Sequence, residues 1–197
     1  MKTRLIAAVA ALILASSAHA GHIDATPSLD KLPREMLGTY TSNPGETLNA
    51  FLLRVGTALH TYSEQANYEA CGVIAVATDD KASAQFAVIT HSNHAHIGCA
   101  TDAHDIPAGM VSSGTTIHSH IMRHKATLNA TDWLMRGLPM PTDGPHEIVI
   151  AHPEQFSSND FDEPGYLATD SGVFFQDGKG TERSIGSFST ASSTGAL

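Results

Sequence analysis

The sequence has few cysteines, few basic residues and a small share of charged residues overall. Only 2 of its 197 residues are cysteine, so the chain is not a small scaffold built from disulfides. Lys and Arg number 11 against 20 Asp and Glu, and the net charge of -9 argues against nucleic acid or an anionic membrane as the main partner. With 16% charged and 42% apolar residues, a disordered acidic tail and a coiled coil are also excluded.

Long apolar runs are missing as well, except at the N-terminus. Lys2 and Arg4 precede an uncharged, mostly apolar run over residues 5–18, and Ala18 and Ala20 are the small residues that signal peptidase reads. We therefore expect residues 1–20 to be a secretory signal peptide, cleaved after Ala20, and the mature protein to be secreted or periplasmic. The run is too short to span a bilayer and no later run is longer, so no membrane association is expected after cleavage.

The mature chain is expected to begin with a leader, residues 21–45, which has little periodicity and lies on the domain. Residues 42–46, where the leader meets the domain, have the composition of a helix start. Apolar residues then recur at helical spacing and predict a helix to about Gln65 with one buried stripe. The stripe consists of Leu48, Phe51, Leu52, Val55 and Leu59.

Several short segments rich in β-branched and aromatic residues predict strands. A helical turn is expected over 132–137, and the Ser/Thr/Gly-rich tail 186–197 is expected to be flexible. This order favours a single α/β (α+β) domain around a mixed sheet flanked by helices. The predicted strands are 72–77 and 85–90 as a hairpin, 115–120, 147–151, 166–169 and 173–176.

The two cysteines, Cys71 and Cys99, could form one disulfide in an oxidising compartment. If the predicted hairpin turns near Asp80, Cys71 lies opposite about position 91 rather than 99, so the spacing alone leaves the bridge open.

Histidine is abundant, with 12 residues, and its arrangement carries the strongest chemical signal. His118 and His120 lie two apart in a predicted strand, where alternate side chains point to the same face and can converge on one ion. Zinc accepts imidazole nitrogens and takes a third protein ligand and a water in catalytic sites. A His-x-His pair alone is a weak signal, because two histidines on a strand are often surface residues.

Two further motifs flank this pair. Glu69-Ala70-Cys71-Gly72 precedes the first predicted strand, and Ser157-Ser158-Asn159-Asp160 is followed by Gly165-Tyr166-Leu167. Together, over residues 46–185, the three motifs resemble the JAMM (MPN-plus, JAB-like) zinc metalloproteases, most closely their bacterial secreted and toxin-associated branch. The resemblance implies a cytidine-deaminase-like fold.

The resemblance also implies roles for these residues. His118, His120 and Asp160 would hold Zn²⁺, Glu69 would act as general acid/base, and Ser157 would help to hold the oxyanion. The expected function is hydrolysis of an amide bond, peptide or isopeptide, in a peptide or protein substrate by a metal-activated water.

The sequence departs from the family pattern in two places. Ile121 stands where a proline commonly follows the second histidine. The usual spacing would make Asp132 the third ligand, with Asn129 in place of the serine, whereas Asp160 requires an insertion of residues 121–156. We favour Asp160, and interpret Asp132 as a helix residue that faces solvent or the insertion.

Two other functions are consistent with the sequence. A non-catalytic binding module on the same fold would need no intact site. A His-rich periplasmic metal-binding protein would use His91, His94 and His96, of which the last two would share a strand face. The role of these histidines, and whether 121–156 forms a lid, are left open by the sequence.

Overall fold

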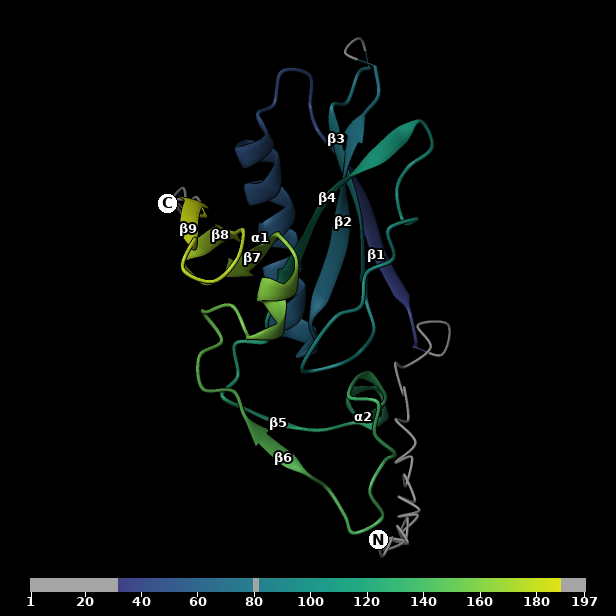
Figure 1. Cartoon of the computed structure of the whole chain (residues 1–197), viewed down its shortest axis with the longest axis vertical. Coiled ribbons are helices and arrows are strands. Elements are labelled where there is room, and N and C mark those ends of the chain that lie inside the picture. Colours follow the sequence, from purple (N-terminus) through teal and green to yellow (C-terminus); the bar gives the residue numbers. More distant parts are fainter. Residues whose placement is uncertain (1–31, 80–81, 189–197) are drawn as a thin grey trace, which may run out of the picture.

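The computed structural model describes residues 32–79 and 82–188 (Figure 1). The predicted signal peptide, the first part of the leader and residues 189–197 of the tail lie outside these ranges. The described chain folds around a seven-stranded mixed sheet of strand order β1-β3-β2-β4-β7-β8-β9, with a separate two-stranded sheet, β5-β6. The predicted mixed α+β class is confirmed.

The sheet is formed by segments from both ends of the described chain. Only β4 and β7 run parallel, and all other neighbouring strands are antiparallel. The elements are β1 (Glu35–Thr41), α1 (Leu48–Ala66), β2 (Ala70–Ala77), β3 (Phe86–Ser92), β4 (Met110–Ser119), β5 (Lys125–Thr127), α2 (Ala130–Met135), β6 (Glu147–Val149), the 3₁₀ helix η2 (Asn159–Asp162), β7 (Gly165–Thr169), β8 (Gly172–Gln176) and β9 (Arg183–Gly186).

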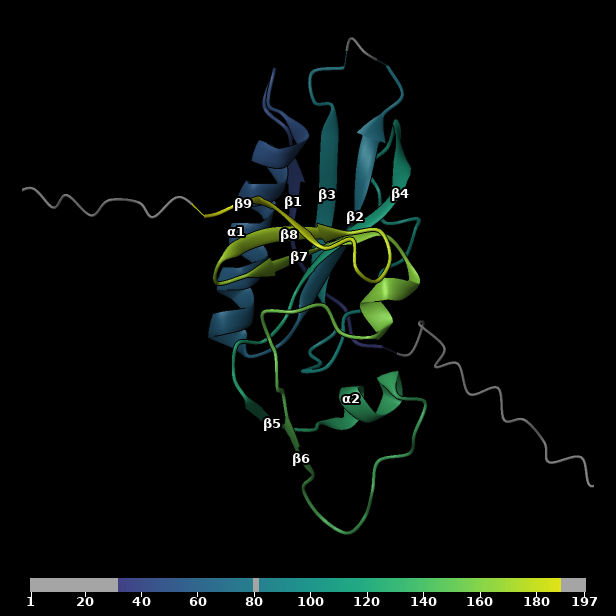
Figure 2. The ribbon, with the colours of Figure 1, turned by 60° about the vertical axis from the view of Figure 1, so that its left-hand side comes forward.

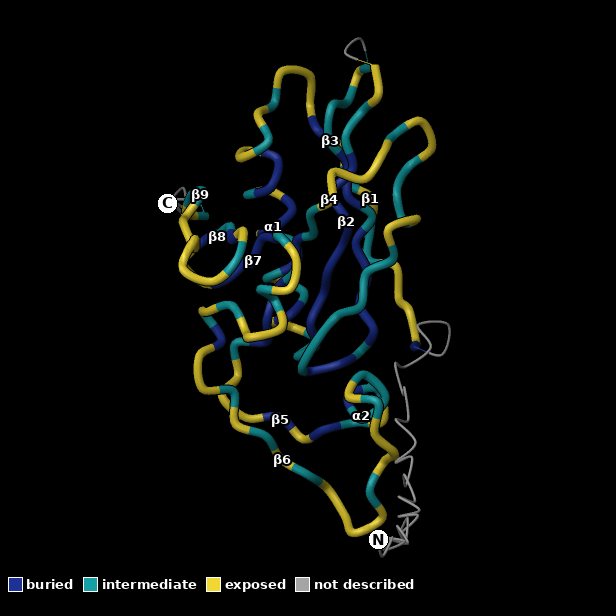
Figure 3. Tube along the Cα trace, viewed as in Figure 1, coloured by how far each residue is buried: buried dark blue, intermediate teal, exposed yellow. Residues whose placement is uncertain are grey.

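Helix α1 covers one face of the sheet and forms the main core with it. The predicted stripe is buried from Phe51 to Leu59 and packs against Ile74, Ile117 and Val173 of the strands. Figure 2 shows α1 beside the sheet, and Figure 3 shows buried segments in the helix and in the central strands. Gly56 permits the close approach, because an added Cβ would lie 2.5 Å from a Val173 methyl carbon. None of the helices in the described ranges is long and apolar enough to cross a membrane.

The hairpin prediction is confirmed by β2 and β3. Cys71 pairs with His91, as the turn position predicted. The helix start was predicted too early, because the N-cap of α1 is Thr47, whose side chain accepts a hydrogen bond from the Ala50 amide.

Three strands were not predicted. The leader was interpreted as lacking regular structure, but residues 35–41 form the edge strand β1. Strands β5 and β9 are three and four residues long, and β9 runs into the start of the predicted tail. Segments this short carry almost no periodicity, so only their pairing partners reveal them.

Residues 121–156, the segment that holds β5, α2 and β6, lie beyond the end of the large sheet (Figures 1 and 2). Helix α2 begins with a capping box, in which Asn129 and Asp132 each accept the other's backbone N–H. The predicted helical turn at 132–137 is thus confirmed, beginning two residues earlier.

Candidate metal centre

The alternation of β4 places its two histidines on the sheet face that α1 leaves uncovered. Ile117 and Ser119 point toward α1, where Ile117 joins the core and the Ser119 hydroxyl lies 2.6 Å from that of Ser63. His118 and His120 therefore point to the opposite face. They line a cavity of about 980 Å³ together with Glu69, Ser157 and Asp160.

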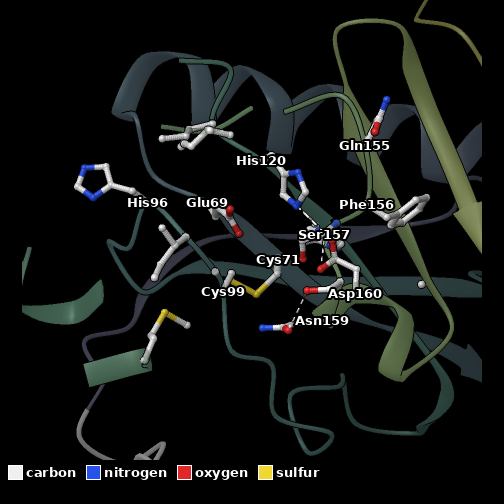
Figure 4. Close-up of a pocket in the computed structure, with 18 of the residues that line it drawn as sticks. Glu69, Cys71, His96, Cys99, His120, Gln155, Phe156, Ser157, Asn159 and Asp160 are labelled. Atoms are coloured by element: carbon white, nitrogen blue, oxygen red, sulfur yellow. Dashed lines mark hydrogen bonds and ion pairs between the residues drawn. A yellow bond between two sulfur atoms is a disulfide. The ribbon is translucent and has the colours of Figure 1, made fainter. Parts of the chain in front are cut away.

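The structure brings His118, His120 and Asp160 together. Figure 4 shows the side chains of His120 and Asp160 on facing sides of this group. The two Nε2 atoms are 3.2 Å apart, and each lies 3.4 Å from one Asp160 carboxylate oxygen. Two ligand atoms bound at 2.0–2.1 Å to a tetrahedral ion are roughly 3.3 Å apart. The spacing of these donors therefore fits one small metal ion.

Hydrogen bonding from residues 121–156 sets the tautomer of His120. Its Nδ1 lies 3.2 Å from the carbonyl oxygen of Pro153, which can only accept, so Nδ1 carries the hydrogen. The lone pair of the neutral ring is then on Nε2, directed toward Asp160. Histidines that bind metals commonly donate their other N–H to a carbonyl in this way.

The charges of the group are strongly coupled. Burial lowers the pKa of His118. Burial also acts to lower the pKa of His120, but the Glu69 and Asp160 carboxylates outweigh it and raise that pKa to about 9. Burial opposes ionisation of Asp160, yet hydrogen bonds with both histidines hold its pKa far below the usual range. Without a metal, a proton held by His120 therefore balances the Asp160 carboxylate.

Glu69 lies on the same face, one position before β2. Because Ala70 pairs with Ser119 and Cys71 with His118, the antiparallel register places Glu69 beside His120. Its residue surface is only 7% exposed, and burial raises its pKa to about 8, which the nearby His120 partly offsets. The Glu69 carboxyl group lies beside the three residues that could hold a metal ion, His118, His120 and Asp160, but is not one of them. We call such a set of possible ligands a metal-capable group.

Ser157 is exposed at the edge of the cavity, next to Asp160 (Figure 4). Its backbone N–H donates to Asp160 Oδ2 at 2.6 Å, and its carbonyl accepts from the Asp160 N–H at 3.2 Å. These bonds fold the Ser-x-x-Asp segment into a turn, which brings the serine and the carboxylate to one place.

Gln176 on β8 binds this turn through hydrogen bonds. Its role was not predicted from the sequence. The side chain is fully buried, and its Nε2 donates to the carbonyl oxygens of Asp160 at 2.5 Å and Glu163 at 2.6 Å. Its Oε1 accepts from the Gly178 N–H at 2.7 Å. A glutamine in a predicted strand gives no signal for this role, because the loop that it binds lies in another part of the sequence.

Asp132, the competing aspartate, lies elsewhere, and the expectation that it faces solvent or the insertion was wrong. It is fully buried and accepts from the backbone N–H of His96 at 2.6 Å, with His96 Nδ1 at 2.7 Å from its other oxygen. With Asn129, which donates to the His94 carbonyl, it attaches α2 to the loop after β3. The hydrogen bonds of Asp132 thus join α2 to the loop after β3.

The other histidines are dispersed, and the expected shared strand face of His94 and His96 was wrong. Strand β3 ends at Ser92, and His94 adopts a left-handed backbone conformation with φ 57°. His94 pairs with Glu35 at 2.7 Å, and His91 Nε2 lies 2.8 Å from the Ala100 carbonyl. No metal-capable group within the described ranges contains His94 or His96.

Cys71 and Cys99 form a disulfide, which resolves the pairing that the sequence left open. It connects β2, two residues after Glu69, to the loop that lines the cavity opposite Asp160 (Figure 4). Cys71, Cys99 and His91 also lie close enough together to hold a metal ion, but both cysteines are oxidised to the disulfide. Another group, His60 with Glu64 and Asp170, has two exposed carboxylates, one of which pairs with His60 at 2.9 Å.

A scan against protein-family models finds no match for this chain, and searches of curated proteins and of solved structures find none either. The geometry of the site is therefore what indicates a function for this chain.

Proposed function

We propose that this protein is a zinc-dependent metallopeptidase of the JAMM type, exported by its signal peptide and active outside the cytoplasm. The observation that carries the proposal is the convergence of two histidines and one aspartate at ligand spacing, with a buried, non-ligating glutamate beside them. His118, His120 and Asp160 would hold the ion. Bound zinc lowers the pKa of a water molecule toward 7 and polarises a carbonyl group.

The chain's own residues supply the proton transfers and the orientation. Glu69 takes the proton of the attacking water and gives it to the leaving amine, a role suited to a buried carboxyl group that lies beside the three ligands without being one of them. The Ser157 hydroxyl donates a hydrogen bond to the oxygen of the scissile carbonyl. Residues 150–152 and the disulfide-bonded loop form walls that keep a peptide segment over these groups.

Metal stoichiometry tests the proposal directly. Purified residues 21–197, supplied with zinc, are expected to hold one zinc ion per chain by elemental analysis. His118→Ala and Asp160→Ala should lose the ion, because each removes one of only three protein ligands. Asp132→Ala is the matched control and should keep it, since Asp132 binds His96 instead. A wild-type protein without zinc would contradict the proposal and favour the non-catalytic binding module.

Metal binding should release protons, because His120 must be neutral to bind. The raised pKa of His120, about 9, means that the metal competes with a proton at pH 7.5. The apparent zinc affinity is therefore expected to rise with pH, by about tenfold per unit, until pH 9. Calorimetry in buffers of different ionisation enthalpy measures the release, and we expect about one proton or more per zinc. Binding without proton release would show that His120 is already neutral.

Gln176 is expected to set metal affinity through the turn that carries Asp160. Gln176→Met keeps the side-chain length but removes both donors, so zinc affinity should fall roughly 10–100-fold, as for other groups that orient a metal ligand. Gln155→Met is the control, because Gln155 lines the cavity but is exposed. Competition with a chelator gives the affinities. Equal affinities in the two folded variants would refute the role.

A further inference from the structure

A second hollow, of about 670 Å³, opens beside the metal cavity. Residues 154–156, Ser158 and Phe161 form one side of it, and Phe174, Lys179 and Glu182 form the other. We refer to it as the phenylalanine hollow, after Phe156, Phe161 and Phe174. It holds none of the metal-capable groups and is not used by the chemistry described above.

The phenylalanine hollow adjoins the candidate metal centre. Gln155, Phe156 and Ser158 line both cavities. The Phe156 ring stands edge-on to His118 with centroids 6.4 Å apart, and its other neighbour is Phe161 at 5.8 Å. A single aromatic ring therefore separates the hollow from a metal ligand.

The strand β8 builds both sites from the same face. Val173 and Phe175 pack toward the core under α1, so Phe174 and Gln176 point to the opposite side. Gln176 binds the turn of Asp160, and Phe174 lines the hollow next to it. The position of the hollow relative to the metal ligands is thus fixed by the sheet.

The chemistry of the hollow selects its occupant. Three partly exposed phenyl rings favour an apolar group that removes them from water. The charged side chains at the hollow are two acidic ones, Glu154 and Glu182, and one basic one, Lys179, so they disfavour an acidic ligand. A peptide lying across the metal centre would bring its neighbouring side chain to this place.

We propose that the phenylalanine hollow is a specificity subsite, which accepts an aromatic or large aliphatic side chain next to the scissile bond. The inference rests on the proposed function, because it takes the substrate to be a peptide. It assigns the specificity of the enzyme to Phe156, Phe161 and Phe174.

The binding test needs neither zinc nor catalysis. N-acetylphenylalanine amide, added to isotope-labelled protein, is expected to shift the NMR signals of Phe156, Phe161 and Phe174, whereas N-acetylalanine amide should leave them unchanged. Phe174→Ala should weaken binding about tenfold, since burial of a phenyl ring contributes that much or more. Leu138→Ala removes an equally apolar, exposed side chain outside both cavities and should bind as the wild type does. Shifts elsewhere, or none, would overturn the subsite.

The cleavage test separates the subsite from the enzyme activity. Zinc-loaded protein is incubated with a peptide mixture, and the cleaved bonds are identified by mass spectrometry. We expect aromatic and large aliphatic residues to be enriched at one position beside the bond, and Phe174→Ala to lose that enrichment while keeping its zinc. Cleavage without enrichment would overturn the subsite and leave the peptidase intact. Binding in the hollow without any cleavage would refute the proposed function and, with it, the role as a specificity subsite, and would leave the hollow as a binding site for apolar side chains.

Discussion

Glu69→Gln is expected to keep its zinc and to lose hydrolysis of a peptide mixture by a factor of about 100 or more, the usual contribution of a positioned general base. Glutamine has the shape of glutamate but cannot accept the proton of water. The replacement should not unfold the protein, because it removes a carboxyl group whose ionisation is already disfavoured by burial. Elemental analysis and the release of new amino groups measure the two effects.

Glu163→Gln is the matched control for this experiment. Glu163 also lines the cavity, but its side chain is exposed, and the loop uses its backbone carbonyl as acceptor from Gln176. This variant is expected to retain both zinc and activity. A Glu69→Gln protein as active as the wild type would show that another group moves the proton.

Removal of the disulfide should produce the largest change in stability. Cys71 and Cys99 are 28 positions apart, and a crosslink across such a loop restricts the unfolded chain by about 3.5 kcal/mol. The double variant Cys71→Ser, Cys99→Ser is therefore expected to lower the free energy of unfolding by about this amount. Denaturant unfolding, followed by circular dichroism, measures the difference.

Two comparisons test whether the crosslink itself is responsible. Wild-type protein in a strong reductant should unfold at nearly the same denaturant concentration as the double variant. The double variant should not respond to the reductant at all. If the oxidised and reduced wild-type proteins unfold together, the crosslink does not stabilise the fold.

Local sequence patterns predicted those helices and strands that are long enough to show a full period of apolar residues. The stripe of α1 and the hairpin register of Cys71 opposite His91 are set by near neighbours in sequence, and both could be derived. The convergence of His118 and His120 also follows from strand alternation alone. Asp160 was favoured over Asp132 only because its surrounding residues resemble a family motif.

Contacts between distant segments could not be predicted in this way. The residues around Asp132 in the sequence do not indicate that its carboxylate binds His96, which lies on another loop. The spacing of Cys71 and Cys99 likewise did not decide whether they form a disulfide. The bonds from Gln176 to the turn of Asp160 depend on the β7–β8 pairing. Each of these is a tertiary contact, which a single sequence does not display as a pattern.

The parallel pairing of β4 with β7 has a consequence for the synthesis of this protein. The two strands are adjacent in the sheet, but residues 120–164 separate them in the chain. Contacts of such high sequence separation form late, because a long loop must close first. Because the chain emerges N-terminus first, in synthesis as in the proposed export, the first four strands of the sheet can pair before β7 has emerged. A nascent chain therefore carries both histidines without Asp160, and a polypeptide truncated before η2 never completes the group.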